Sequence, residues 1–92
     1  MIVHLRIFGA LERYFGDSRI QVELPAGAKL HDLWDLIDTH WGEKLPPQFW
    51  DAEAKRFRRR VSVMTHNTDV YDDDLPLSDQ QEILLLVVLA GG

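Results

Sequence analysis

Residues 83–92 read ILLLVVLAGG, an unbroken apolar run that leads into a pair of glycines. Seven consecutive apolar residues, 83–89, predict a β-strand that is apolar on both faces. Either this strand is central and well covered, or its outer face is a docking surface for another protein. We favour docking, because Ile2 and Phe8 would add apolar area to the same outer face and exposed apolar patches commonly mark interfaces.

The two glycines suggest a chemical use for the same end of the chain. Glycine has no Cβ, so a Gly-Gly segment can enter a narrow channel and present its last carbonyl group without steric shielding. We therefore expect residues 90–92 to form a flexible tail, with the Gly92 carboxylate as the reactive group and Gly91 as its flexible neighbour. The plain alternative is a frayed terminus, since chain ends are commonly disordered.

The first part of the chain shows the periodicity of strands and of a short helix. Apolar residues alternate with polar ones over 3–8 and again over 20–24, which predicts two half-buried strands. Between them, apolar residues spaced by three and four positions predict a short helix that ends at Gly16.

The main helix is predicted by one apolar stripe over residues 30–41. Asp32, Asp35 and Asp38 fall on the opposite side of this stripe, where we expect them to face water. Gly42 marks the end of the helix.

Residues 44–60 are rich in turn formers and predict an irregular loop with at most a helical turn. Phe49 and Trp50 lie outside any clear period, so we expect them at a contact surface or in a cluster that caps the loop. The loop also carries Lys55, Arg56, Arg58, Arg59 and Arg60. This basic run is most simply a charged edge beside a strand, although it could bind a phosphate or a carboxylate.

The remaining pattern completes one domain over residues 1–92. A strand is predicted at 61–66, a turn at 67–68 and a crossing segment at 71–77, before the final strand. This order of elements predicts an α+β fold, in which one main helix packs across one face of a mixed sheet.

Composition excludes several classes of function. The chain has no cysteine, which removes thiol catalysis and disulfides. Its net charge of −5 opposes nucleic-acid binding and suits a basic protein partner. We expect a cytoplasmic protein that does not contact membranes. No segment has the roughly 20 apolar residues of a membrane span, and no signal peptide is recognisable.

No metal site is expected. The four histidines form no recognised ligand pair: His4, His31, His40 and His66. An acidic run at 69–74 lacks the spacing of a calcium-binding loop, so we interpret it as a solvated loop that could steer a basic partner. No arrangement of Ser, His and Asp is detectable from spacing, and independent catalysis is not expected.

Several short segments together resemble a known family. They are Phe8-Gly9-Ala10-Leu11, Val22-Glu23-Leu24-Pro25-Ala26-Gly27-Ala28, Asp32-Leu33, Asn67, Pro76-Leu77, Glu82 and Ala90-Gly91-Gly92. In their order and spacing, over nearly the whole chain, they resemble the MoaD/ThiS family of sulfur carriers, which includes the small subunit of molybdopterin synthase. The resemblance implies a β-grasp, ubiquitin-like fold.

The resemblance also implies a function as carrier and cosubstrate. In the family, a MoeB- or ThiF-like enzyme adenylates the terminal glycine with ATP and Mg²⁺, and sulfur then replaces AMP to give a thiocarboxylate. A MoaE-like large subunit receives the tail and uses the sulfur for molybdopterin. The implied roles are activation at Gly92 and flexibility at Gly91, with no cofactor bound by this chain. Activation is needed because an ionised α-carboxylate is a poor electrophile.

From the final strand and its neighbour we expect partner contacts by six residues. These are Phe8, Leu84, Leu86, Val88, Leu89 and Ala90. Three other hypotheses are compatible with the same tail. The chain could be a carrier that serves another acceptor, such as thiamine thiazole or cysteine, or a ubiquitin-like modifier that forms isopeptide bonds. It could also be an interaction module whose tail is never activated.

Two segments differ from the family pattern. Val87-Val88 stands where many members have a proline pair, and valine keeps both N–H groups available for pairing. Asp79-Gln80-Gln81-Glu82 replaces an Asp-Gly-Asp-Glu turn, so a position with positive φ is either held by a residue other than glycine or absent.

Overall fold

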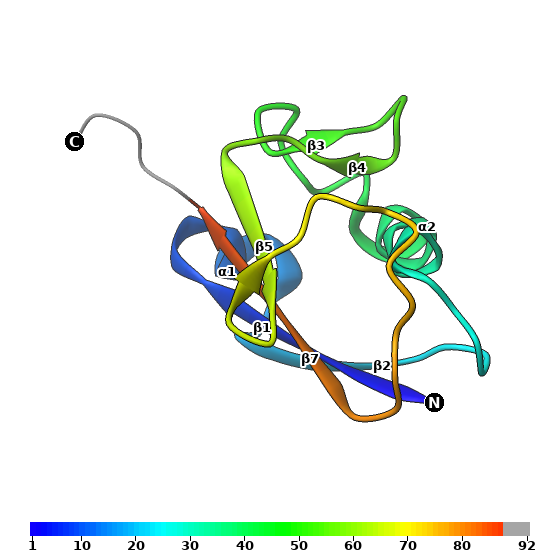
Figure 1. The fold of residues 1–92 in the computed structure, drawn as a ribbon. Coiled ribbons are helices and arrows are strands. Elements are labelled where there is room, and N and C mark those ends of the chain that lie inside the picture. The colour runs from blue at the N-terminus through cyan, green and yellow to red at the C-terminus, as the bar shows by residue number, and fades with distance from the viewer. Residues whose placement is uncertain (88–92) are drawn as a thin grey trace.

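The computed structural model describes residues 1–87 and shows a mixed five-stranded sheet with one long helix beside it (Figure 1). The strands are β1 (Ile2–Phe8), β2 (Arg19–Glu23), β5 (Val61–Thr65), β6 (Thr68–Asp69) and β7 (Gln81–Val87). Their order in the sheet is β2-β1-β7-β5-β6. β7 pairs in parallel with β1 and antiparallel with β5, so it is the central strand. The predicted α+β class is confirmed.

The hydrophobic core lies between this sheet and α2 (Leu30–Trp41). Alternate residues of β1 and β7 are fully buried: Val3, Leu5, Ile7, Ile83 and Leu85. The helix contributes Leu30, Leu33, Trp34 and Ile37. Full burial of one large aliphatic side chain is worth about 1.5–3 kcal/mol, so these residues decide which face of each strand turns towards α2.

The short helix and the main helix form where the sequence predicts them. A 3₁₀ turn, η1 (Gly9–Leu11), continues into α1 (Glu12–Phe15), which ends at Gly16 with φ of 85°. A positive φ of this size suits glycine, because a Cβ would be strained there. At the start of α2, the Lys29 backbone N–H donates to Asp32 Oδ2 at 2.8 Å. Asp32 caps the first turn and is half-buried, which corrects the expectation that it simply faces water.

The prediction of an irregular loop over 44–60 is wrong in part. The segment contains a hairpin of β3 (Trp50–Asp51) and β4 (Arg56–Phe57). Trp50 and Phe49 are 2% and 6% exposed, so the expected contact surface is absent and the alternative, a cluster that caps the loop, is what forms. The Trp50 ring lies 4.8 Å from the Phe57 ring, and the Phe57 ring lies 5.2 Å from that of Trp34 on α2.

Asp38 is the second helix carboxylate that does not simply face water. It is half-buried, and its Oδ1 accepts a hydrogen bond from Trp50 Nε1 at 3.0 Å. A buried indole N–H needs an acceptor, and this bond fastens the hairpin to α2.

The second half of the chain differs from its prediction at element boundaries and by one short edge strand, β6, which the sequence did not predict. The turn between β5 and β6 lies at His66 and Asn67, with φ of 52° and 60°, one residue earlier than expected. The crossing segment is confirmed and runs against the start of α2, where Leu30 N–H donates to Leu75 C=O at 2.9 Å. The final strand begins at Gln81 instead of Ile83. In the part of the chain that the structure describes, no helix has the length and apolar character needed to cross a bilayer.

Replacing Trp50 tests whether the hairpin belongs to the core. We expect Trp50→Ala to lower the free energy of unfolding by about 3–5 kcal/mol, because a large buried aromatic group is removed. Trp50→Phe keeps most of the packing and loses the bond to Asp38, so its cost should be about 1–2 kcal/mol. Urea denaturation followed by circular dichroism measures both values. A cost below about 1 kcal/mol for the alanine variant would show that the hairpin is not part of the cooperative core.

Candidate functional site

The outer face of the sheet, which points away from α2, carries apolar side chains at its centre. Phe8 is 37% exposed and Leu86 is 40% exposed, and the two are direct partners in the parallel β1–β7 pairing. Leu84 lies two residues before Leu86 on the same face and is half-buried. Phe8, Leu84 and Leu86, which the sequence analysis named as partner contacts, thus come together; we call these three residues the outer patch.

Polar and charged groups border the outer patch. The Arg6 guanidinium lies over the Phe8 ring at 5.5 Å from its centroid, and Arg6 Nη1 is 3.4 Å from Glu82 Oε2. On the other side, β5 places the polar Ser62 opposite Leu86, whereas the half-buried Met64, opposite Leu84, extends the apolar surface. An apolar centre with a polar rim is the usual anatomy of a protein interface.

The position of β7 answers the question raised by its unbroken apolar sequence. The strand is central, and its inner residues Ile83 and Leu85 are completely buried. Its outer residue Leu86 nevertheless remains exposed. The strand is therefore central and also exposes an apolar side chain, because α2 covers only one of its two apolar faces.

Hydrogen bonds from the preceding turn fix the start of β7. Gln80 has φ of 68°, so the position with positive φ is present and is held by glutamine. Its backbone N–H donates to Ile2 C=O at 2.6 Å, and its side-chain Oε1 is 2.7 Å from His4 Nε2. Asp79 Oδ1 accepts from the Ile2 N–H at 2.7 Å, and this bond is the main reason why the pKa of Asp79 is lowered from its ordinary value. We call these contacts the turn clamp.

A buried polar pair fixes the other side of the same strand. Gln81 Nε2 donates to Thr65 Oγ1 at 2.9 Å, and Thr65 Oγ1 donates to Glu82 C=O at 2.9 Å. Gln81 Oε1 accepts from the Ser78 N–H at 2.8 Å. No sequence pattern predicted this pair, although a glutamine at the head of an apolar strand is a signal that could have revealed it. The pair joins β7 to β5 and helps to set the direction of β7.

The other residues predicted for the site lie outside the described part of the chain. They are Val88, Leu89, Ala90, Gly91 and Gly92. Their roles in partner contact and activation, and the flexibility of the tail, stay predictions. In the sequence they follow β7 directly.

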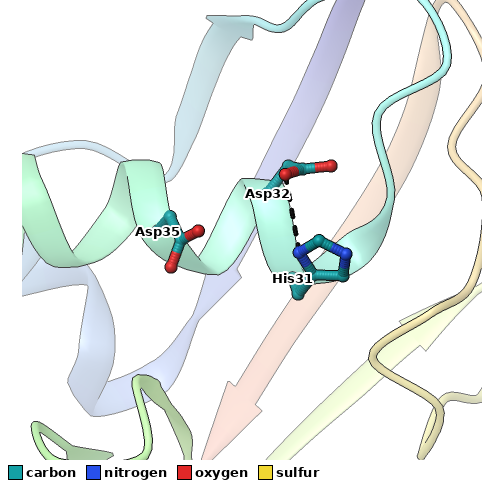
Figure 2. Close-up of side chains that lie close together, drawn as sticks. All are labelled: His31, Asp32 and Asp35. Atoms are coloured by element: carbon teal, nitrogen blue, oxygen red, sulfur yellow. Dashed lines mark ion pairs between the residues drawn. The ribbon is translucent and has the colours of Figure 1, made fainter.

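Three side chains of the kinds that bind metal ions lie close together at the start of α2 (Figure 2). One ligand atom from each of His31, Asp32 and Asp35 lies within 4.8 Å of the others. The sequence signals part of this group, because Asp35 follows His31 by four positions and Asp32 by three, and both spacings bring side chains together on a helix. His31 Nδ1 is 3.5 Å from Asp32 Oδ1, and the second oxygen of Asp32 caps the helix. Helix capping and this contact account for the positions of His31 and Asp32 without a metal ion.

Comparison with known proteins places the fold. No protein-family model matches the sequence, and no curated protein is significantly similar to it. SAMP1 from Haloferax volcanii matches with a TM-score of 0.80 at 15% identity, over 100% of both chains. Urm1 from Trypanosoma brucei matches with a TM-score of 0.78 at 18% identity, over 99% of this chain and 95% of that one.

A third match is a component of a complex. It belongs to the complex of subunits 1 and 2 of the molybdopterin-converting factor from Helicobacter pylori, with a TM-score of 0.67, 20% identity and 100% of both chains covered. Together the matches define the class: this chain has the β-grasp fold of ubiquitin-like proteins. Within that class, its fold matches the MoaD/ThiS family, as the sequence resemblance implied.

Adjacent residues of β7 provide a test of the two faces. We expect Leu85→Ala to lower the free energy of unfolding by about 2–5 kcal/mol, because Leu85 is fully buried. Leu86→Ala should cost about 1 kcal/mol or less, because much of its side chain is already in water. Urea denaturation of the two variants gives the comparison. Equal costs would mean that the outer patch is covered in the free chain.

Proposed function

We propose that this chain is a ubiquitin-like sulfur carrier that acts as the small subunit of a molybdopterin synthase. A MoeB- or ThiF-like enzyme adenylates the Gly92 carboxylate with ATP and Mg²⁺, and the acyl adenylate becomes a thiocarboxylate. A MoaE-like large subunit then receives the tail and uses its sulfur to build molybdopterin. The carrier binds no cofactor of its own and has no independent catalytic group.

One observation carries the proposal: the outer patch lies on the strand whose sequence continues into the Gly-Gly tail. Leu84 and Leu86 belong to β7, and only residues 88–90 separate this strand from Gly91. An enzyme that docks on the outer patch would therefore find the reactive end of the chain close to its own surface. The match with a subunit of a molybdopterin-converting complex supports the same assignment.

The chemistry divides between the carrier and its enzyme. A carboxylate oxygen of Gly92 attacks the α-phosphorus of ATP and displaces pyrophosphate. A sulfur nucleophile at the oxidation level of sulfide then attacks the acyl carbon, and AMP leaves. The carrier supplies an unshielded carbonyl group, because neither Gly91 nor Gly92 has a Cβ. It also supplies the outer patch, through which the enzyme would recognise it.

A second candidate is a protein modifier. The two matches with SAMP1, the small archaeal modifier protein 1 of Haloferax volcanii, have TM-scores of 0.80 and 0.77, above the 0.73 and 0.67 of two molybdopterin-converting factor matches. The same adenylate would then be attacked by a lysine amine of another protein, which forms an isopeptide bond. A carrier for another acceptor, such as thiamine thiazole or cysteine, shares the thiocarboxylate and differs only in the last step.

Intact mass spectrometry tests activation. After incubation with a host extract, ATP and a sulfur source, we expect a gain of about 16 Da, the difference between sulfur and oxygen, which deletion of Gly92 abolishes. A gain that persists without Gly92 would contradict the proposal, as would no gain beside an active cognate enzyme. Conjugates of higher mass on an immunoblot would identify the modifier instead.

A matched pair of variants links activation to the outer patch. Phe8→Asp places a charge at the centre of the patch and should reduce the rate of thiocarboxylate formation at least about 10-fold, as expected when a charge is buried in an interface. Gln48→Asp adds the same charge to an exposed loop outside the patch and should leave the rate unchanged. Equal rates for both variants would show that the enzyme docks elsewhere.

A further inference from the structure

A second surface of the molecule carries charges that the proposed function does not use. Half of the chain's ten lysine and arginine residues lie in and beside β4. This basic strip consists of Lys55, Arg56, Arg58, Arg59 and Arg60, all exposed. In a chain of net charge −5, such a concentration of positive charge is a distinct feature.

An acidic strip lies across a cleft from the basic one. It consists of Asp69, the last residue of β6, and of Asp72, Asp73 and Asp74 after this strand. The cleft has a volume of about 890 Å³, and both strips line it, the basic one with Arg56, Arg58 and Arg59 and the acidic one with Asp69 and Asp73. In Figure 1 the chain on the acidic side is the yellow segment, and the chain on the basic side belongs to the β3–β4 hairpin.

Some of these charges are satisfied within the chain. Arg56 Nη2 lies 3.4 Å from Asp73 Oδ2 across the cleft, and Arg58 Nη1 lies 3.7 Å from Asp51 Oδ2. Within residues 1–87, no ion pair engages the other three cations of the basic strip or the first two carboxylates of the acidic one. These are Lys55, Arg59, Arg60, Asp69 and Asp72. Opposite charges therefore remain available on the two sides of the cleft.

Tyr71 adds an apolar anchor to the acidic side. It lines the cleft and is 83% exposed, more than Phe8 or Leu86. Tyrosine is among the residues that contribute most to interfaces, and its ring attracts a guanidinium group placed over its face. The Tyr71 hydroxyl donates to Asp69 Oδ2 at 3.5 Å, while the ring stays largely in water.

From this charge pattern we propose that a second copy of the chain docks on this surface, forming a dimer with two-fold symmetry. A two-fold axis that runs along the cleft, parallel to the two strips, would set the basic strip of each copy against the acidic strip of the other. Tyr71 of each copy would then meet Arg59 or Arg60 of its partner copy. A uniformly acidic ligand would be repelled by the acidic strip, and a uniformly basic one by the basic strip, whereas a second copy matches both.

The proposed contact centres on the cleft, which Phe8, Leu84 and Leu86 do not line. Ser62 lines the cleft and also lies opposite Leu86, so the dimer would border the outer patch. A standard interface takes about 800 Å² from each partner. This chain exposes 5870 Å² in all, and the contact proposed is small and polar. We expect a dissociation constant between about 10 μM and 1 mM, which rises with salt because the contacts are exposed ion pairs.

Analytical ultracentrifugation of the full chain, over a range of concentrations at low salt, tests the proposal. The double variants Arg59→Glu/Arg60→Glu and Asp69→Lys/Asp72→Lys should each weaken self-association at least about 10-fold, because like charges then face each other. Mixed in equal amounts, they should form a heterodimer within about 3-fold of the original affinity, because opposite charges again meet at both contacts. Circular dichroism checks that both variants fold.

Two further variants keep the outcome clear. Tyr71→Ala removes an exposed ring, so the fold should persist while association weakens at least about 3-fold. Deletion of Gly91 and Gly92 should leave association unchanged, which separates this proposal from the carrier function. A chain that stays monomeric at about 1 mM would overturn the proposal. Failure of the two reciprocal double variants to form a heterodimer would also overturn it. Loss of association in Leu86→Asp would overturn it as well, because the contact would then lie on the outer patch.

Discussion

The parallel pairing of β1 with β7 is the constraint on which the rest of the structure depends. Side chains alternate along a strand, so the alignment of Val3 with Gln81 decides the face of every residue that follows. It sends Ile83 and Leu85 towards α2 and leaves Leu86 beside Phe8 on the outer face. A shift by one residue would expose the first pair and bury the outer patch. The core and the candidate docking surface therefore share one cause.

Polar contacts at the head of β7 hold this alignment. The turn clamp joins Asp79 and Gln80 to Ile2, and the buried pair of Gln81 and Thr65 joins β7 to β5. A strand that is apolar on both faces has little preference of its own between them. Directional hydrogen bonds at one end supply that preference, and they leave the other end to continue towards the Gly-Gly tail.

The sequence was sufficient where periodicity extends over several residues. The strands over 3–8 and 20–24 and the helix over 30–41 follow from apolar spacing, and the outer patch follows from the unbroken apolar run. The β3–β4 hairpin was missed because strands of two residues show no period, and because Trp50 packs against α2 through Asp38. Gln80 was left open because a positive φ at glutamine has no sequence signal of its own. These failures share one origin: contacts between distant segments decide the structure there.

In this account, the free face of β7 brings an activating enzyme to the chain, and the tail that follows β7 supplies the reactive group. The most direct test is a titration of the ¹⁵N-labelled full chain with a MoeB- or ThiF-like enzyme from the same host, followed by backbone amide NMR. The account predicts that the largest changes among residues 1–87 centre on Phe8, Leu84 and Leu86. Changes centred on the exposed side of α2, around Asp35 and Thr39, with the outer patch unaffected, would contradict it.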